Sequence, residues 1–297
     1  MKNMAASARQ RLLNRARNDK RPFNELLQYY AMERFLYRLS RSNHANHFIL
    51  KGALMLRVWR APEFRPTMDI DMLGRTSNEE IAIVAQIRDI LATPFPDDGL
   101  LFDSGSIETE PITEDADYPG LRIRFRATLD TARITMQVDI GFGDVVYPGP
   151  EEADLPVMLD LPAPRMLCYS KESAIAEKFE AMVSLGLLNS RMKDFYDIWL
   201  LSRQFDFEAA NLTEAVRRTF DQRGTAMPND IEAFTNAFAK TKQTQWQAFH
   251  KRLGQDHLPA SFEEVVDALR AFLTPISQHL SYGESMPARW IASGPWR

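Results

Sequence analysis

The chain of 297 residues contains a single cysteine, Cys168. An internal disulfide needs two cysteines and a cysteine-based zinc site needs several, so the sequence excludes both. A lone thiol is typical of the reducing cytoplasm, where we expect the protein to be located. The sequence also lacks any apolar run of about 18–20 residues, so it predicts no membrane-spanning helix.

Two widespread catalytic motifs are missing as well. There is no G-x-x-x-x-G-K-[ST] phosphate-binding loop, which argues against a P-loop NTPase. There is no G-x-S-x-G element, which argues against a serine hydrolase. Because 45% of the residues are apolar and 26% are charged, the chain has an ordinary globular composition, and its chemistry must come from other residues.

Charge is distributed unevenly along the chain. Residues 1–65 contain 14 Lys and Arg against 4 Asp and Glu, whereas residues 66–168 contain 7 against 20. The basic region favours contact with a polyanion, and the acidic region favours a bound cation. The alternative is a solvated basic helix beside acidic loops, and charge alone leaves both interpretations open.

Hydrophobic periodicity predicts an α/β protein: N-terminal helices, a small mixed sheet, and a helical region at the C-terminal end. The predicted strands are His47–Leu50, Met68–Leu73, Leu101–Ile107, Leu121–Leu129 and Arg133–Phe142. Within Leu121–Leu129 the arginines at 122, 124 and 126 alternate with Leu121, Ile123 and Phe125, which predicts a half-buried strand with the arginines on its polar face. The Pro- and acid-rich segment Tyr147–Pro164 has no clear period, so we expect a domain boundary there, between residues 1–165 and 166–297. The last residues, rich in Gly, Pro and Ser, are expected to form a loose tail.

The strongest local pattern is Lys51-Gly52-Ala53-Leu54 followed by Asp69-x-Asp71. Residues i and i+2 of a strand point to the same side, so the two carboxylates repel each other unless a cation lies between them. Mg²⁺ is the natural candidate, because it binds through one or two carboxylates together with substrate phosphates. A glycine between a strand and a helix lets phosphate oxygens approach backbone N–H groups. The alternative for such a pair is a solvated surface position.

Asp139 lies within the apolar strand pattern Met136–Asp144, on the side opposite Val138 and Ile140. A lone acid in such a strand is commonly a solvent-facing residue. A two-metal phosphoryl-transfer site, however, needs a third carboxylate from a neighbouring strand, to bind a metal or to accept the proton of the attacking hydroxyl.

A third pattern combines Glu177-Lys178-Phe179-Glu180 with R-x-K-D-x-x-D at Arg191–Asp197. On a helix Asp194 and Asp197 are i,i+3 neighbours, while Phe195 and Trp199 can be buried. This is either an ordinary amphipathic helix with ion pairs or a site in which Asp194 orients Lys178 toward a nucleotide phosphate.

Taken together, these patterns resemble the AbiEii-type nucleotidyltransferase toxins of the polymerase-β-like superfamily, in the same order over residues 45–205. The E-K element followed by R-x-K-D-x-x-D is the distinctive part, and D-x-D is shared across the superfamily. The resemblance implies a polymerase-β-like lobe with a small mixed sheet plus a C-terminal helical lobe. The family often has Ser or Gly after the motif glycine, whereas this chain has Ala53, which removes a hydroxyl that could bind phosphate.

The resemblance also implies roles for individual residues. Asp69, Asp71 and Asp139 would be catalytic and would bind the metal, Mg²⁺ with Mn²⁺ as the alternative. Lys178 and Asp194 would be essential residues of the helical lobe. The positions implied to contact the NTP substrate are Gly52, Thr67, Lys178 and Arg191.

For partners, the resemblance implies an RNA acceptor, which is tRNA in studied relatives, and a type IV antitoxin encoded nearby that need not form a stable complex. We therefore expect an enzyme that transfers a nucleotide to RNA and blocks translation. Nothing in the sequence requires more than a monomer, and no membrane contact is expected. Two alternatives remain open: nucleotidylation of a protein or small molecule, and a non-catalytic RNA- or partner-binding protein.

Overall fold

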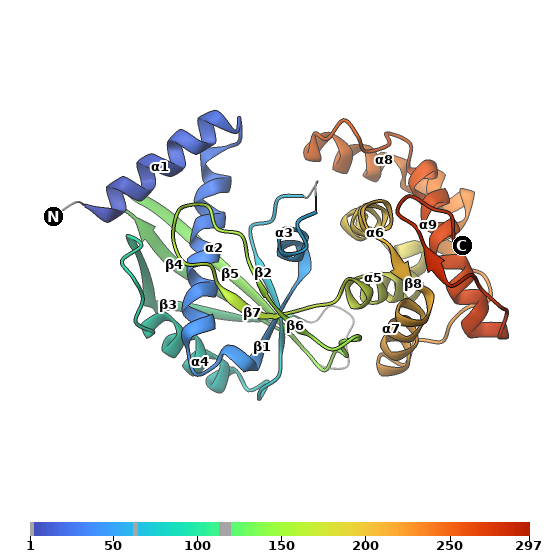
Figure 1. The fold of residues 1–297 in the computed structure, drawn as a ribbon, viewed down its shortest axis with the longest axis horizontal. Helices are drawn as coiled ribbons and strands as arrows, with labels where there is room; N and C mark the ends of the chain where they lie inside the picture. Colours follow the sequence, from blue (N-terminus) through green and yellow to red (C-terminus); the bar gives the residue numbers. More distant parts are fainter. Residues whose placement is uncertain (1–2, 62–64, 113–119) are drawn as a thin grey trace. The chain divides into compact units, whose positions relative to one another are not determined.

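A computed structural model describes residues 3–61, 65–112 and 120–297 (Figure 1). The chain forms two compact units. One comprises Met1–Asp144 with Pro150–Tyr169, and the other comprises Val145–Gly149 with Ser170–Arg297. The first contains a mixed sheet and the second is mainly helical, so the predicted α/β fold class is confirmed. No helix in the described part of the chain is long and apolar enough to cross a membrane.

The sheet of the first unit has seven strands within the described residues, in the order β3-β4-β5-β2-β1-β7-β6. The pairs β2/β5 and β1/β7 are parallel, and the other neighbours are antiparallel. The strands are β1 (Phe48–Lys51), β2 (Ile70–Gly74), β3 (Leu100–Ile112), β4 (Gly120–Leu129), β5 (Ala132–Phe142), β6 (Glu151–Asp154) and β7 (Arg165–Cys168).

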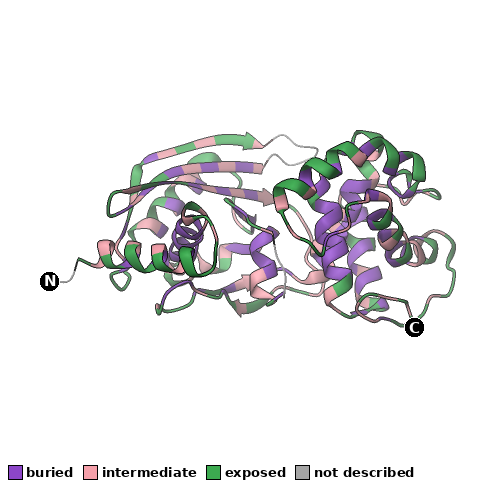
Figure 2. Cartoon of the chain, turned by 90° about the horizontal axis from the view of Figure 1, so that it is seen from above, coloured by how far each residue is buried: buried purple, intermediate pink, exposed green. Residues whose placement is uncertain are grey.

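One face of this sheet is covered by helices and the other carries polar side chains. Along β4, Ile123 and Phe125 are buried, whereas Arg122 and Arg124 are half-buried and Arg126 is exposed, which is the predicted alternation (Figure 2). Helix α2 crosses the buried face with α4 beside it (Figure 1). The helices of this unit are α1 (Met4–Asn18), α2 (Phe23–Arg41), α3 (Met55–Val58) and α4 (Glu80–Ala92).

One strand prediction needs correction, and strand β6 was not predicted. The strand expected from Met68 begins at Ile70, so Asp69 lies just before β2 rather than within it. The segment Tyr147–Pro164, in which a domain boundary is expected, contains β6, which pairs with β7. Backbone hydrogen bonds to β7 hold β6 in the sheet. The side chains of β6 are mostly exposed, so the sequence shows no hydrophobic period there.

The second unit consists of helices and a two-stranded sheet, with bounds α5 (Lys171–Leu185), α6 (Met192–Gln204), α7 (Ala209–Gln222), α8 (Asn236–Leu253), α9 (Phe262–Tyr282), β8 (Phe207–Glu208) and β9 (Arg289–Trp290). The expectation of a loose tail is wrong. Strand β9 pairs with β8, and the rings of Trp290 and Trp296 pack on Phe272 at centroid distances of 4.8 and 5.8 Å. Aromatic burial therefore fixes the C-terminal residues despite their Gly- and Pro-rich composition.

Several N-terminal arginines have partners inside the first unit. Arg11 pairs with Asp160 at 2.7 Å, and Arg15 donates a hydrogen bond to the Met158 carbonyl. On α2, Arg38 is 1% exposed and lies 2.9 Å from the equally buried Asp98. The positive charge of this region is thus used partly to bind α1 and α2 to the rest of the unit.

Glu33 is a buried acid on α2, with its side chain only 2% exposed. Its carboxylate accepts a hydrogen bond from the Met158 amide at 2.6 Å and lies 3.5 Å from Arg34 Nε. Burial raises the pKa of Glu33 from its ordinary value of 4.5 to about 7, against the opposing effect of Arg34. A raised pKa means that the folded protein holds this proton more tightly than the unfolded chain does.

We predict that this group makes the protein less stable as the pH rises from about 4.5 to about 7, because the unfolded chain ionises Glu33 first. The full effect corresponds to about 3 kcal/mol. Glu33→Gln should flatten this part of the stability curve, as measured by urea denaturation between pH 4.5 and 8. An unchanged slope in the variant would show that Glu33 does not cause the dependence.

Candidate active site

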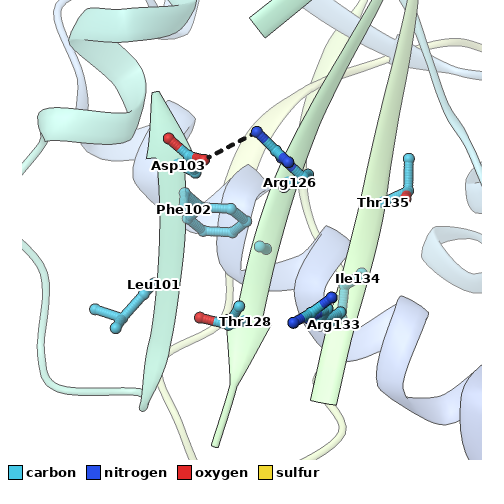
Figure 3. A pocket seen from close by; sticks show the side chains of 9 residues that line it. Leu101, Phe102, Asp103, Arg126, Thr128, Arg133, Ile134 and Thr135 are labelled. Atoms are coloured by element: carbon cyan, nitrogen blue, oxygen red, sulfur yellow. Dashed lines mark ion pairs between the residues drawn. The ribbon is translucent and has the colours of Figure 1, made fainter. Parts of the chain in front are cut away.

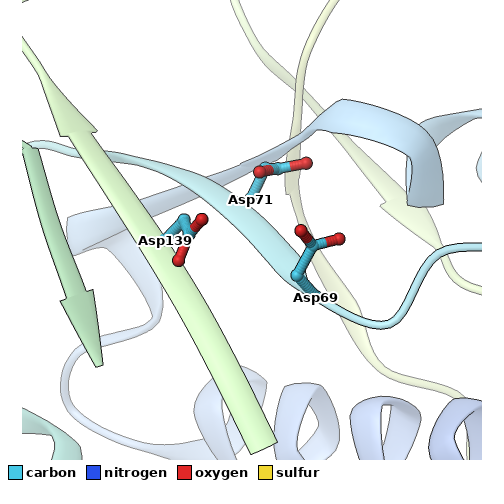
Figure 4. A group of neighbouring side chains, drawn as sticks. All are labelled: Asp69, Asp71 and Asp139. Carbon is cyan, nitrogen blue, oxygen red and sulfur yellow. The ribbon is translucent and has the colours of Figure 1, made fainter. Parts of the chain in front are cut away.

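Three carboxylates meet on the open face of the first unit. Asp69 lies just before β2, Asp71 lies on β2, and Asp139 lies on β5. Strands β2 and β5 run parallel with Asp71 directly opposite Asp139, so both side chains leave the sheet on the same side. One oxygen of each carboxylate lies within 4.8 Å of the others (Figure 4). All three residues are half-buried.

This donor set fits a divalent cation. Two carboxylates about 5 Å apart repel each other by about 3 kcal/mol at an effective dielectric constant of 20, so the arrangement gains from a positive charge at its centre. Hard oxygen ligands of this kind are those that Mg²⁺ and Mn²⁺ take. The three side chains lie on the polar face of the sheet, opposite the face that packs against the helices.

Gly52 follows β1, where the chain turns into α3. Its φ is +72°, a conformation that L-residues with a side chain rarely adopt. A Cβ atom at this position would overlap the carboxylate of Asp71. Glycine is therefore required both by the backbone and by the close approach of an acidic side chain.

Thr67 is buried and contacts both Asp69 and Tyr29. Its hydroxyl donates a hydrogen bond to Asp69 Oδ1, and its backbone amide donates to the Tyr29 hydroxyl at 3.3 Å. These bonds hold the chain before β2 against α2. In this structure Thr67 orients the Asp69 carboxylate.

Asp139 has a charged partner that the sequence analysis did not single out. Arg122, directly opposite on β4, donates from Nε to Oδ1 at 2.9 Å and from Nη2 to Oδ2 at 2.7 Å. The hydrogen bonds to Asp139 raise the pKa of Arg122 further above its usual range. The alternation along β4 identified Arg122 as a polar-face residue, but not which strand lies beside it.

A second charged cluster lies in the second unit. Lys178 on α5 donates from Nζ to Asp194 Oδ1 at 2.9 Å and lies 3.0 Å from Asp197 Oδ2, both on α6. The two acids are 7% and 4% exposed and Lys178 is 18% exposed, so a single ammonium lies against two nearly buried carboxylates. The sequence pattern predicted the contact between Lys178 and Asp194. The structure adds a second acidic partner of Lys178, Asp197.

The turn between α5 and α6 brings these residues together. Ser170 caps the start of α5 by accepting a hydrogen bond from the Ser173 amide, and Gly186, at φ +46°, ends it. The buried Asn189 side chain then bridges the two helices, because it accepts from the Arg191 amide at 2.8 Å and donates to the Ala181 carbonyl. The helices consequently pack with Lys178 beside the first turn of α6.

Arg191 lies at the start of α6 and lines a hollow of about 440 Å³ in the second unit. The charged side chains around this hollow are all basic: Arg191, Lys193 and Arg252.

A further hollow, of about 550 Å³, lies on the open face of β3, β4 and β5 (Figure 3). Arg126 and Arg133 are exposed on it, and Arg126 lies 3.6 Å from Asp103. Arg126 and Arg122 share a face of β4 four residues apart, which corresponds to about 13 Å. The same face of the sheet thus carries exposed arginines at one end and the three carboxylates at the other.

Comparison with protein families decides the class. The family model described as "Nucleotidyl transferase AbiEii toxin, Type IV TA system" matches residues 34–268, which includes both charged clusters. The chain belongs to this family. The protein is accordingly a nucleotidyltransferase, and the resemblance inferred from the sequence is confirmed. Type IV toxin–antitoxin systems pair a toxin with an antitoxin, so the AbiEii family implies an antitoxin partner.

Two solved structures from Helicobacter pylori are similar to this member of the AbiEii family. One is described as a candidate nucleotidyltransferase; it is 15% identical, with a TM-score of 0.46, and the match covers 85% of this chain and 94% of that one. The other is JHP933, also 15% identical, with a TM-score of 0.42 and coverage of 86% and 94%. A comparison with curated proteins gives no match.

We predict that Gly52→Ala reduces nucleotide transfer at least about 100-fold and lowers stability by about 1–3 kcal/mol, because the new Cβ strains the backbone and displaces Asp71. Transfer and the melting temperature should be measured together. Gly149→Ala is the matched control, since nothing lies within 4 Å of a Cβ there. Normal transfer by the Gly52 variant would contradict the close approach.

Proposed function

We propose that this nucleotidyltransferase uses Mg²⁺ to move an NMP group from an NTP onto RNA, with tRNA as the first acceptor to test, and so blocks translation. The supporting observation is the meeting of Asp69, Asp71 and Asp139 within 4.8 Å in a chain of the AbiEii family. Residues 1–165 would form the nucleotidyltransferase core and residues 166–297 a helical lobe. A monomer acting in the cytoplasm is sufficient for this activity.

In the proposed reaction a hydroxyl oxygen of the acceptor attacks the α-phosphorus of the NTP. A new P–O bond forms, the bond to the β-phosphate oxygen breaks, and pyrophosphate leaves. Mg²⁺ held by Asp69, Asp71 and Asp139 would neutralise the phosphate charge. Asp139 stands across β2 from Lys51, the residue before Gly52, and can accept the hydroxyl proton, while Thr67 holds Asp69 in position.

An RNA acceptor is favoured by the charge pattern of the open sheet face. Arg126 and Arg133 are exposed there, on the same side of the sheet as the three acids. A polyanionic strand lying along this face would contact these cations with its backbone phosphates and reach the acids with its end. Proteins and small molecules, the alternative acceptors, gain less from these two exposed arginines.

We predict that purified protein with Mg²⁺ and α-labelled NTPs transfers label to total RNA, and that Asp71→Ala abolishes the transfer. The variant should stay folded, because the substitution removes one of three closely spaced carboxylates that repel one another. An equal loss of activity and stability would argue that Asp71 is structural.

The acceptor is read out in the same assay by separating RNA, protein and small-molecule products. Label on tRNA supports the proposal in full, and label on protein alone contradicts the RNA acceptor but keeps the enzyme class. Omission of divalent metal should stop the reaction. Full activity in the presence of a chelator would contradict the metal role of the three acids.

Lys178 is proposed to contact the phosphates of the NTP, with Asp194 fixing its ammonium. The pair is nearly buried, so its members are held in one geometry before substrate arrives. We propose that Lys178 both stabilises the fold and takes part in transfer. A single substitution at this position would change both, so its effect on activity alone could not be assigned.

We predict that Lys178→Ala nearly eliminates transfer and also costs about 3 kcal/mol of stability, since two nearly buried acids lose their shared cation. Adding Asp194→Ala should restore part of that stability by removing one of these acids, but not the activity. Urea denaturation and single-turnover transfer separate the two effects. Recovery of transfer in the double variant would show that the cluster is structural only.

A further inference from the structure

The geometry points to Arg122 as a positioning residue that competes with the divalent cation for Asp139. In the absence of metal it would hold the third carboxylate neutralised, and loading of metal at Asp139 would require Arg122 to withdraw. This inference rests on the proposed metal role of the three acids and deepens it, because it concerns what controls access to that site.

The first observation is how completely Asp139 is engaged. Arg122 donates to both carboxylate oxygens, at 2.9 and 2.7 Å, and Gln137 Nε2 donates to Oδ2 at 3.3 Å. A carboxylate offers about four lone-pair positions. Three of them are occupied, and the remaining one lies on Oδ1.

The second observation is the register of the sheet. Asp139 on β5 faces Asp71 of β2 on one side and Arg122 of β4 on the other. The three side chains form a single row across the strands, so a cation bound between the acids would sit on the side of Asp139 away from Arg122. Both cations would then act on the same carboxylate from a few ångströms apart.

Electrostatic repulsion disfavours a bound metal ion and an intact Arg122–Asp139 ion pair at the same time. A divalent ion and a guanidinium that share one half-buried carboxylate repel each other, and the protein around them screens this repulsion less than bulk water does. The Arg122 side chain is 29% exposed, so solvent lies within reach when the bidentate pair opens. A fixed structural pair would behave differently, because metal affinity would then be unchanged or lower when Arg122 is removed.

The inference is tested by titrating Mn²⁺ alone into the full chain and following free Mn²⁺ by electron paramagnetic resonance. Arg122→Gln should bind Mn²⁺ at least about tenfold more tightly than the original protein. Arg122→Lys, which keeps the charge but loses the fork, should fall between them. Unchanged or weaker binding in Arg122→Gln, with the melting temperature retained, would overturn the inference.

Arg126→Gln is the matched control. It removes the same charge from the same face of β4, but about 13 Å away, beyond the range of strong interaction at physiological salt. Its Mn²⁺ affinity should equal that of the original protein. A gain equal to that of Arg122→Gln would reduce the effect to net charge and overturn the specific role of the pair.

Two further variants separate this inference from the proposed function. In an Asp139→Asn background, Arg122→Gln should change the Mn²⁺ affinity less than about twofold, since the shared carboxylate is gone.

Asp71→Ala should abolish Mn²⁺ binding at the three acids. If Asp71→Ala leaves Mn²⁺ binding intact, the proposed metal site itself is wrong. If it abolishes binding while Arg122→Gln has no effect, only the competition is wrong. If Arg122→Gln does not fold, Arg122→Lys decides by the same criterion.

Discussion

Repulsion between neighbouring carboxylates is the constraint on which the first unit is built. Asp71 and Asp139 are paired across two parallel strands, so the spacing of the sheet, about 4.8 Å, sets the separation of their backbones. The opposite face of the same strands is buried, with Met72 and Ile140 at 1% and 0% exposure. Hydrophobic burial on that face therefore holds the acids together against their charge.

The same row of side chains shows how the charge is compensated. Lys51, opposite Asp71 on β1, pairs with Asp144 at 2.8 Å, and Arg122 on the other flank pairs with Asp139. The two central acids are thus bordered by cations on both sides of the row. These flanking cations offset part of the repulsion between the two acids in the absence of a bound metal.

The basic N-terminal region illustrates a different use of charge. Arg38 is paired with Asp98 inside the unit, and Arg11 and Arg15 join α1 to the segment around Met158. Charge counted along the sequence therefore overstates what is offered to a polyanion. Attraction of any polyanion depends on which arginines stay exposed after folding, and these include Arg126 on the sheet.

The sequence by itself determined the mixed α/β class, the alternating face of β4 and the family, because these depend on local periodicity and on short motifs. It singled out the acids Asp69, Asp71 and Asp139, of which Asp71 and Asp139 lie on strands and Asp69 lies just before β2. It did not find β6, or the packing of the C-terminal residues against Phe272, since backbone pairing and long-range aromatic contacts leave no local period. Only the tertiary structure decided that Arg122 faces Asp139, because a strand's own pattern states which side a residue takes but not which strand lies beside it, nor in what register.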